Sequence, residues 1–467
     1  MNTEVENVQS EEERQLFETA LAASEQYRNF TTEQVTKIVT AVCTAAAEKA
    51  EFYAEWAVRD TGYGNVQDKI LKKQIGSLGQ LEAWDPADFI EPVIDREKKM
   101  ISYPRPAGIL VGLSPVTNPV STVFYLTAHA LMTRNALIIC PHPGSKECSL
   151  DAIELVNRVA EENGAPKGVI QGLREISIPA VDSIMKNPNT SLILAIGGAA
   201  MVHAAYSSGN PALGVGAGNI PCYVHKTADP AVVGPTVVMS SSFDNSLPCT
   251  TESVVLADSE IADALKENMK AAGGYFVNSE EGQKLRDFCW PEGQMNPDIL
   301  GKDATWLAEQ SGFSTPEDTR SLVVEITEIG YHEPVSKEKM WPVLGFKIIT
   351  GGVDEAIQCA LGMLDMMGKG HSAAVHSTDS TVIAKWGAAL PVCRVSINAA
   401  NVLGATGIDT NLPVTLQLGT GFYSGSSTDH NCTPADLLQW NRVAYNKDDA
   451  VVMGDDIEAA VEATKHG

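Results

Sequence analysis

The spacing of hydrophobic positions changes near residue 100. From Glu11 to about Leu81, apolar residues recur every three or four positions among Ala, Glu and Lys, as in "TTEQVTKIVTAVCTAAAEKAEFYAEWAV". This period predicts amphipathic helices, with Thr31 or Thr32 as the N-cap of one of them. From residue 101 the chain shows short apolar runs that end in Gly and Pro turns, such as "AGILVGLSPVTNP" and "NALIICPHPGS", with helical stretches between them. This alternation predicts a parallel sheet with crossover helices.

A second set of strand and helix signals begins near Ala231 and includes "TTESVVLADSEIADALKENMKAAGG", "LGFKIIT" and "HSAAVHS". It predicts a second α/β domain. After Leu412 the chain is rich in Gly, Ser and Thr, and "TPADLLQWNRVAYN" is interpreted as helical. We therefore expect an α/β protein with three parts: 1–230, with the N-terminal helices and a nucleotide-binding domain; 231–412, a second domain; and 413–467, a C-terminal segment.

Composition limits the function. A chain of 467 residues with 44% hydrophobic content can bury a large core and divide into two or three domains. The formal net charge of -25 argues against a nucleic-acid partner, because phosphate binding needs clustered Lys and Arg. The nine cysteines include no CxxC pair and no metal-ligand spacing, which indicates reduced thiols and no metal site.

Nothing in the sequence predicts a membrane partner. The N-terminus "MNTEVENVQSEEERQLFETA" has neither a basic nor an apolar region of the kind found in a secretory signal. No stretch reaches the roughly 18 uninterrupted apolar residues of a membrane span. We therefore expect a soluble, cytoplasmic protein.

Three predicted strand ends carry chemically marked segments: "LSPVTNP" (113–119), "CPHPGS" (140–145) and "AIGGAAMV" (195–202). In open α/β sheets, ligands bind at the carboxyl ends of strands. None of the three matches GxGxxG. Gly197 and Gly198 either admit a phosphate to a helix N-terminus or only make a tight turn, and both interpretations remain open. The glycine-dense stretch "SSGNPALGVGAGNIP" (207–221) favours close approach of a ligand to the backbone.

One cysteine differs from the others in its surroundings. Cys249 lies in "FDNSLPCTTES", among small and polar residues. A structural cysteine usually sits among aliphatic neighbours as a small hydrophobe. Cys249 is therefore the candidate for a reachable, reactive thiol.

These segments, taken in order, resemble the coenzyme A acylating branch of the aldehyde dehydrogenase superfamily. The resemblance rests on "SPVTNP", "PHP", the long "AAYSSG.PALGVGAGN" block, "FDN....C..ES" and "SKEKMWPVLG", and it runs from about residue 12 to 446. It implies two Rossmann-like parallel-sheet domains with an oligomerisation element. The first, 1–230, would bind NAD(P), the second, 231–412, would be the catalytic domain that carries the nucleophilic cysteine, and the C-terminal segment, 413–467, would return to the nucleotide-binding and oligomerisation side. It also implies a homodimer or homotetramer.

The resemblance implies a role for individual residues. Cys249 matches the nucleophile, and Asn118 matches the side-chain amide that helps to form the oxyanion hole. His371 matches a histidine of the acylating branch, which either handles coenzyme A and its proton or is structural. The implied cofactor-binding positions are Ser114, Thr117, Pro141, His142, Gly197, Gly198, Gly216 and Glu338. Of these, Pro141 and His142 match the adenosine ribose contact, and Glu338 matches the nicotinamide ribose contact.

The implied chemistry explains these residue types. A thiolate adds to an aldehyde, the oxyanion of the thiohemiacetal needs donors, and hydride leaves to NAD or NADP. Hydrolytic members of the superfamily carry a glutamate in an "ELGGK"-like segment, whereas the corresponding stretch here, "GVGAGN", has no carboxylate. Without that base, water is slow at a thioester, and the thiol of coenzyme A is the better nucleophile. We therefore expect acyl-CoA as the product, in a reaction that is reversible.

The substrate remains open among acetaldehyde, succinate semialdehyde and sulfoacetaldehyde. The segment 418–427, "LGTGFYSGSS", departs from the family pattern, as do Leu247 and Pro248 before the nucleophile. An anionic aldehyde needs a cation or several donors. Ser424, Ser426 and Ser427 are either such donors or only a loop, and Arg394 occurs across the branch.

Several alternatives stay open. A non-acylating dehydrogenase would take its base from elsewhere, such as Glu252, and a catalytically silent protein would keep the fold and bind nucleotide. Lys146 is the only cation near the strand end that would receive a 2′-phosphate, so NAD is preferred to NADP. Because the sequence ends at Gly467, we expect no alcohol dehydrogenase half. A bacterial microcompartment is the less favoured location.

Overall fold

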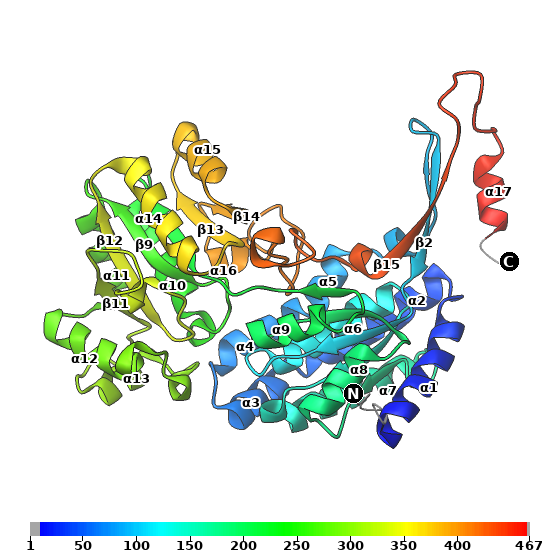
Figure 1. The fold of residues 1–467 in the computed structure, drawn as a ribbon, viewed down its shortest axis with the longest axis horizontal. Helices are drawn as coiled ribbons and strands as arrows, with labels where there is room; N and C mark the ends of the chain where they lie inside the picture. The colour runs from blue at the N-terminus through cyan, green and yellow to red at the C-terminus, as the bar shows by residue number, and fades with distance from the viewer. Residues whose placement is uncertain (1–9, 465–467) are drawn as a thin grey trace, which may run out of the picture.

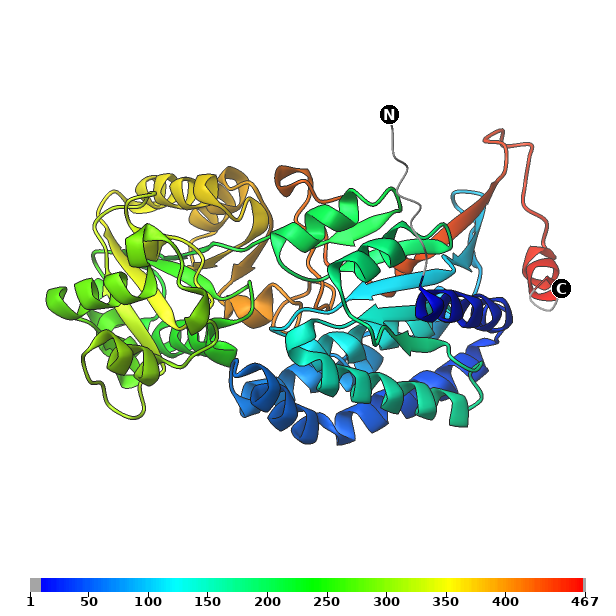
Figure 2. The same cartoon turned by 60° about the horizontal axis from the view of Figure 1, so that its bottom comes forward.

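The computed structural model describes residues 10–464. Residues 1–9 belong to the N-terminal segment that we do not expect to be a secretory signal, and they lie outside this range. Two lobes lie side by side, and an arm projects beyond them (Figures 1 and 2). Within the described residues, no helix combines the length and the apolar character needed to cross a bilayer.

The first lobe contains a five-stranded parallel sheet of order β5-β4-β3-β6-β7. Its strands are β3 (Ile109–Leu113), β4 (Ala136–Cys140), β5 (Ile170–Gly172), β6 (Thr190–Ala195) and β7 (Ala212–Gly214). The helices of this lobe are α1 (Glu11–Tyr27), α2 (Thr32–Glu48), α3 (Ala50–Thr61), α4 (Val66–Ile75), α5 (Leu78–Ala83), α6 (Pro119–Met132), α7 (Lys146–Glu162), α8 (Ile178–Lys186) and α9 (Ala199–Tyr206).

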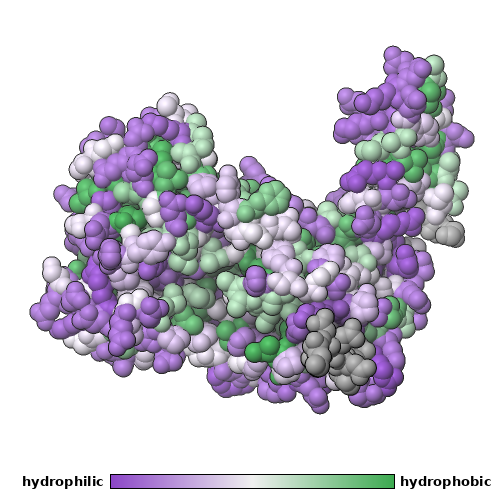
Figure 3. Space-filling model, in the orientation of Figure 1, coloured by the Kyte–Doolittle hydropathy of each residue, from purple (hydrophilic) through white to green (hydrophobic). Residues whose placement is uncertain are grey.

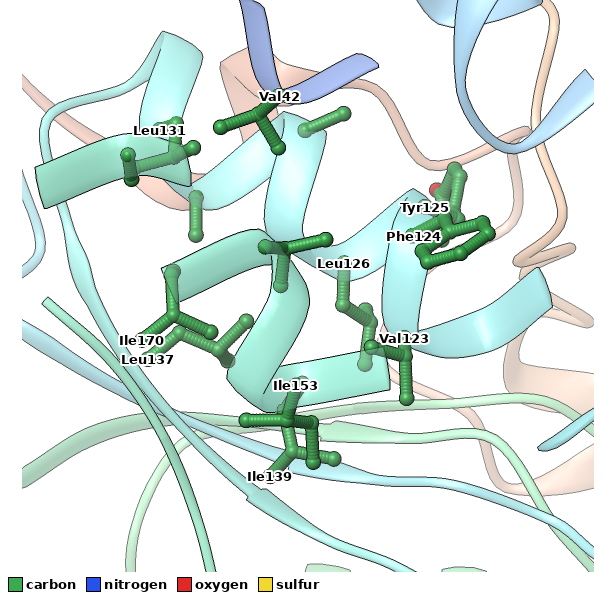
Figure 4. Close-up of a cluster of buried hydrophobic side chains, with 14 of the residues drawn as sticks. Val42, Val123, Phe124, Tyr125, Leu126, Leu131, Leu137, Ile139, Ile153 and Ile170 are labelled. Carbon is green, nitrogen blue, oxygen red and sulfur yellow. The ribbon is translucent and has the colours of Figure 1, made fainter. Parts of the chain in front are cut away.

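Both faces of this sheet are covered. Alternate residues of the central strands enter two clusters. Leu137 and Ile139 of β4 pack with α2, α6 and α7 (Figure 4), while Ile138 packs on the other face with α1 and α8. This burial on both sides explains why the strands read as continuous apolar runs. The prediction of helices over 11–81 is confirmed, and Thr31 caps α2 by accepting a hydrogen bond from Gln34 N at 3.3 Å.

The second lobe contains a seven-stranded parallel sheet of order β10-β11-β12-β9-β8-β13-β14. Its strands are β8 (Ile220–Val224), β9 (Glu252–Asp258), β10 (Gly274–Phe276), β11 (Ser321–Glu325), β12 (Val343–Ile349), β13 (Gly370–His376) and β14 (Val392–Ile397). The associated helices are α10 (Pro230–Ser242), α11 (Ala262–Ala271), α12 (Ser279–Cys289), α13 (Ala304–Ser311), α14 (Gly352–Met366), α15 (Ser380–Ala389) and α16 (Asn401–Gly404).

Helices also cover both faces of this second sheet. One buried cluster joins it to α12, α13, α14 and α15, and another joins it to α10 and α11. The predicted fold class, with two parallel-sheet units, is therefore confirmed. The boundary at residue 230 stays a prediction, and β8, which precedes that residue, pairs within the seven-stranded sheet.

The arm is an antiparallel sheet of β1 (Val93–Asp95), β2 (Met100–Pro106) and β15 (Leu438–Ala444), followed by α17 (Ile457–Ala463). It stands away from the surface of both lobes (Figure 3). The helix expected in "TPADLLQWNRVAYN" is wrong: only Pro434–Leu437 forms a 3-10 turn, and the rest is β15. Pairing with β2 along the whole of β15 satisfies its backbone and overrides the local preference.

Candidate active site

Cys249 lies in the loop between α10 and β9. Asp244, Asn245 and Ser246 precede it with φ values of 48°, 54° and 63°, a left-handed run that is rare outside glycine. Such a conformation persists only where the surroundings fix it, and it commonly marks a functional segment. The run redirects the chain so that the thiol is partly exposed and lines a cavity between the lobes.

His371, the first side chain after Gly370 on β13, contacts the thiol. Its Nε2 lies 3.1 Å from Cys249 Sγ. Burial, with a smaller contribution from Glu338, raises the pKa of Cys249 to about 12. Burial, with a smaller contribution from Arg394, lowers the pKa of His371 to about 3. In the free protein the pair is therefore a neutral thiol and a neutral imidazole.

A hydrogen-bond chain holds His371 from behind. Ser372 Oγ lies 3.0 Å from His371 Nδ1, and Asn401 Nδ2 donates to Ser372 Oγ at 3.0 Å. Asn401 Nδ2 also donates to the carbonyl of Thr250 at 2.8 Å. The chain ties the imidazole to the residue that follows the thiol, so their separation is fixed by β13, α16 and the Cys249 loop together.

The cavity beside Cys249 has a volume of about 90 Å³. Its polar lining residues are Lys72, Asn118, Ser121, Thr122, Thr250 and Thr406. The remaining lining, which includes Phe243, Leu403 and Ile408, is apolar. Among residues 10–464, no aspartate or glutamate lines this cavity.

Asn118 reaches the same cavity from the other lobe, as the N-cap of α6. Its Oδ1 accepts a hydrogen bond from Lys72 Nζ of α4, and the same ammonium forms an ion pair with Asp244. Lys69 Nζ lies 3.0 Å from the same carboxylate. Asp244 is fully buried, so this ion pair is shielded from water.

Glu338 lies close to the nucleophile loop. Its Oε1 accepts a hydrogen bond from Gly218 N at 3.1 Å, and burial raises its pKa to about 7. A Cβ at Gly218 would lie 2.0 Å from the carbonyl oxygen of Cys249. Only glycine therefore lets the "GVGAGN" segment run this close to the nucleophile.

The three marked strand ends meet at one edge of the five-stranded sheet. Ser114 N donates to Cys140 O at 3.1 Å, and Ile196 N donates to Leu113 O at 3.3 Å. Ser114 Oγ donates to Pro119 O, so this hydroxyl holds the start of α6. The carbonyl of Thr117 accepts from Lys69 Nζ at 3.3 Å.

The other predicted cofactor positions also lie along this edge. Pro141 follows β4, and the exposed ring of His142 accepts a hydrogen bond from Gly144 N at 3.0 Å. Gly197 and Gly198 precede α9, and the space beside Gly198 is open. The positions fit an approaching ligand, and their assignment to NAD(P) stays a prediction.

A larger cavity of about 440 Å³ opens between α9 and the segment 420–426. Gly216 lines it, as do His203, Lys369 and Tyr423. The segment 418–427 therefore borders both cavities, since Leu418 lines the smaller one.

The polar groups considered for an anionic substrate are engaged in other contacts. Ser424, Ser426 and Ser427 donate their hydroxyl groups to main-chain carbonyls. Arg394 is buried and donates to the carbonyls of His371 and Gly419. These contacts fit serines that hold a loop in place better than serines that donate to a substrate.

Glu252, the alternative base, lies on β9 and is buried. Its Oε1 accepts a hydrogen bond from Asn401 N at 2.9 Å, and burial raises its pKa to about 7. It does not line the cavity beside Cys249. Its contacts are those of a structural carboxyl group.

Sequence reasoning missed Lys72 and Ser372, and it treated Asp244 only as a polar flank of the cysteine. Lys69, Lys72 and Lys73 occur at the spacing of one helix face, which is also typical of a solvated surface. Lys72 and Asp244 are 172 positions apart, so the sequence gives no sign that they meet.

Comparison with known proteins gives consistent relatives. Residues 2–275 match the model of the aldehyde dehydrogenase family. Aldehyde-alcohol dehydrogenase 2 of Entamoeba histolytica is 35% identical over 95% of this chain and 52% of its own length. The chain spans about half the length of the aldehyde-alcohol dehydrogenases that it matches.

Two further relatives match over nearly their whole length. Succinate-semialdehyde dehydrogenase (acetylating) of Clostridium kluyveri is 30% identical over 94% of this chain and 97% of its own. The crystal structure of an acetylating aldehyde dehydrogenase from Geobacillus thermoglucosidasius has a TM-score of 0.90 and 35% identity, covering 93% of this chain and 96% of that one. With the family model matching more than half of its residues, the chain belongs to the aldehyde dehydrogenase family.

Proposed function

We propose that the protein is a coenzyme A acylating aldehyde dehydrogenase that uses NAD or NADP, with Cys249 as the nucleophile. The single observation that carries this proposal is the cavity beside the thiol, which has no carboxylate in its lining among the described residues. A thioester formed there has no carboxylate from residues 10–464 in the cavity lining to activate water, whereas the thiol of coenzyme A is a strong enough nucleophile to attack it without one. The relatives named acetylating support the same reading.

The proposed first step is attack of Cys249 Sγ on the aldehyde carbon. Because burial disfavours both charged forms, the proton moves from sulfur to His371 Nε2 as the carbon–sulfur bond forms rather than before. Ser372 Oγ has a lone pair for a hydrogen on His371 Nδ1, which leaves Nε2 free to accept. Asn118 Nδ2 and the backbone N–H of Cys249 donate to the oxyanion.

The second step is loss of hydride from the thiohemiacetal, which leaves a thioacyl group on Cys249. NAD(P), when bound, would supply the hydride acceptor, and Glu338 is proposed to hold its nicotinamide ribose. His371 then releases to solvent the proton that it took from Cys249. The thiol of coenzyme A attacks the thioacyl carbon and gives its proton to His371, and Cys249 leaves as a thiolate that regains this proton. The larger cavity, with Gly216 in its lining, is the proposed approach to the thioester.

The proposed substrate is a short aldehyde without charge. Apart from the polar groups named above, the cavity lining is apolar, and Lys72, the one cation that lines it among the described residues, is paired with Asp244. A carboxylate or sulfonate would lose its hydration there without gaining a partner. We therefore expect kcat/KM for propionaldehyde to exceed that for succinate semialdehyde by about 100-fold or more, as unpaired burial of a charge requires.

The assay that tests the proposal measures NAD(P)H formed from propionaldehyde with and without coenzyme A. The proposal predicts formation that depends on coenzyme A. Turnover without coenzyme A would favour the non-acylating alternative, and no turnover across a panel of aldehydes would favour the silent one.

A homodimer or homotetramer, joined through the arm, is proposed as the assembly, and sedimentation of the full chain checks it.

A further inference from the structure

We propose that Lys72, held by Asp244, is a positioning residue that sets the orientation of the Asn118 amide. This inference rests on the proposed function, in which that amide stabilises the oxyanion. The feature that carries it is one buried ammonium group shared by two acceptors, Asn118 Oδ1 and Asp244 Oδ2.

The chemistry of the ammonium group decides which way the amide faces. Lysine has three donors and no acceptor, so the atom of Asn118 that meets Lys72 Nζ is the oxygen. The NH2 group then faces away from Lys72, and its contact is with Thr117 Oγ1 at 3.4 Å, at the limit of a hydrogen bond. The amide nitrogen is therefore left to donate elsewhere, and Asn118 lines the cavity of the thiol.

The consequence of losing Lys72 follows from the shape of the amide group. An asparagine amide presents a donor on one side and an acceptor on the other, and the two can exchange by rotation about the terminal bond. Without the lysine, the oxygen is free to face the developing oxyanion, where it would repel charge. With it, the donor is in place before the reaction and no reorganisation is needed.

Asp244 is in turn fixed on several sides. Its Oδ1 accepts a hydrogen bond from Asn65 N at 2.9 Å, and its own N–H donates to Asp68 Oδ2 at 2.7 Å. Lys69 neutralises it further at 3.0 Å. Because Asp244 belongs to the left-handed run before Cys249, the same carboxylate links the nucleophile loop to α4 and hence to Asn118.

The test separates reactions that form an oxyanion from one that does not. p-Nitrophenyl acetate acylates a thiol through a tetrahedral oxyanion, whereas iodoacetamide alkylates it by displacement at a saturated carbon. For Lys72→Met we expect the Cys249-dependent burst of nitrophenolate to slow by about 10-fold or more, toward the loss caused by removing an oxyanion donor. We expect the rate of alkylation of Cys249, measured by mass spectrometry, to stay within about twofold of wild type, since no oxyanion forms.

Lys73→Met is the matched control. Lys73 is one position away on α4 and is also buried, and within residues 10–464 its Nζ donates to the carbonyl of Lys69 at 3.5 Å and to no other group. We expect both of its rates to match wild type. Asp244→Asn provides a second variant should Lys72→Met not fold, and it should slow acylation selectively. In Asn118→Ala, further substitution of Lys72 should cost nothing more.

Two results would overturn the inference: equal slowing of acylation and alkylation, or acylation as fast in Lys72→Met as in wild type. The proposed function fails separately. In that case acetylated wild-type enzyme, mixed with coenzyme A, would release acetate rather than acetyl-CoA, whatever the effect of Lys72. A purely structural role would move both rates and the melting temperature together.

Discussion

The two sides of the active site hold different kinds of polar group. On the side of the seven-stranded sheet, Cys249 and His371 face each other as a neutral pair, because burial raises the pKa of one and lowers that of the other. On the side of α4 and α6, Asn118 accepts a hydrogen bond from Lys72, which forms an ion pair with Asp244. Cys249 and His371, which are proposed to exchange a proton during the reaction, thus start neutral. Asn118, which is proposed to stabilise the negative oxyanion, is held by an ion pair. One buried site can thus keep a nucleophile protonated while its electrostatic support is already assembled.

The largest effect on turnover should come from changing the neutral pair of Cys249 and His371. Replacing Cys249 by serine removes the polarisable nucleophile, and we expect coenzyme A dependent NAD(P)H formation to fall by about 1,000-fold or more. Cys359, also partly exposed, lies outside the cavity and supplies the control substitution to serine. Steady-state rates measure both. Activity that survives in Cys249→Ser would place the nucleophile elsewhere.

His371→Gln should cost about 100-fold or more at pH 7, because the thiol loses its proton acceptor. The ionisation of the Cys249 thiol decides in which direction the rate of this variant changes with pH. Its pKa is raised to about 12, so the thiolate fraction grows with every step in pH across the working range. The rate of the variant should therefore rise with pH toward that of wild type. A flat ratio of the two rates between pH 6 and about 9 would argue that His371 is structural.

A positive charge can be added to the apolar lining of the cavity at its exposed edge. Ile408 lines the cavity and is 38% exposed, so an arginine there can reach both substrate and water. Ile408→Arg should raise kcat/KM for succinate semialdehyde relative to propionaldehyde by about 10-fold, through a charge-assisted hydrogen bond. Ile408→Gln controls for size without charge. Equal gains in the two variants would show that space, and not charge, limits anionic substrates.

The smallest expected effect is on stability, and it distinguishes a structural role of Glu252 from a catalytic one. The pKa of this buried carboxyl group is raised from 4.5 to about 7, so its contribution to stability is fully present below about 4.5 and is lost as the pH rises through about 7. Two and a half pKa units correspond to about 3 kcal/mol. Glu252→Gln keeps an acceptor for Asn401 N and should raise the melting temperature at pH 8 more than at pH 5.

The same variant tests the alternative base. If Glu252 activated water, Glu252→Gln would lose turnover that does not need coenzyme A. We expect coenzyme A dependent turnover to stay within about twofold of wild type, since Glu252 does not line the cavity. A large loss of rate, with no change in melting temperature, would contradict the structural role.

The sequence predicted what depends on local pattern and failed where distant segments meet. The two parallel sheets follow from apolar runs bounded by Gly and Pro, and Cys249 stands out by its polar neighbours. The local sequence of β15 predicts a helix, and only pairing with β2, more than 300 positions away, makes this segment extended. Lys72 was unremarked for the same reason, since the groups that it contacts come from α6 and from the segment after α10.

The central claim is that an acyl group on Cys249 resists water and yields to coenzyme A. The most direct measurement is the lifetime of that acyl group: react the enzyme with propionaldehyde and NAD+, remove small molecules, and follow the mass of the protein with and without added coenzyme A. We predict an adduct on Cys249 that persists in buffer and disappears within seconds of adding coenzyme A, with propionyl-CoA as the product. Rapid decay in buffer alone, with propionate as the product in both samples, would contradict it.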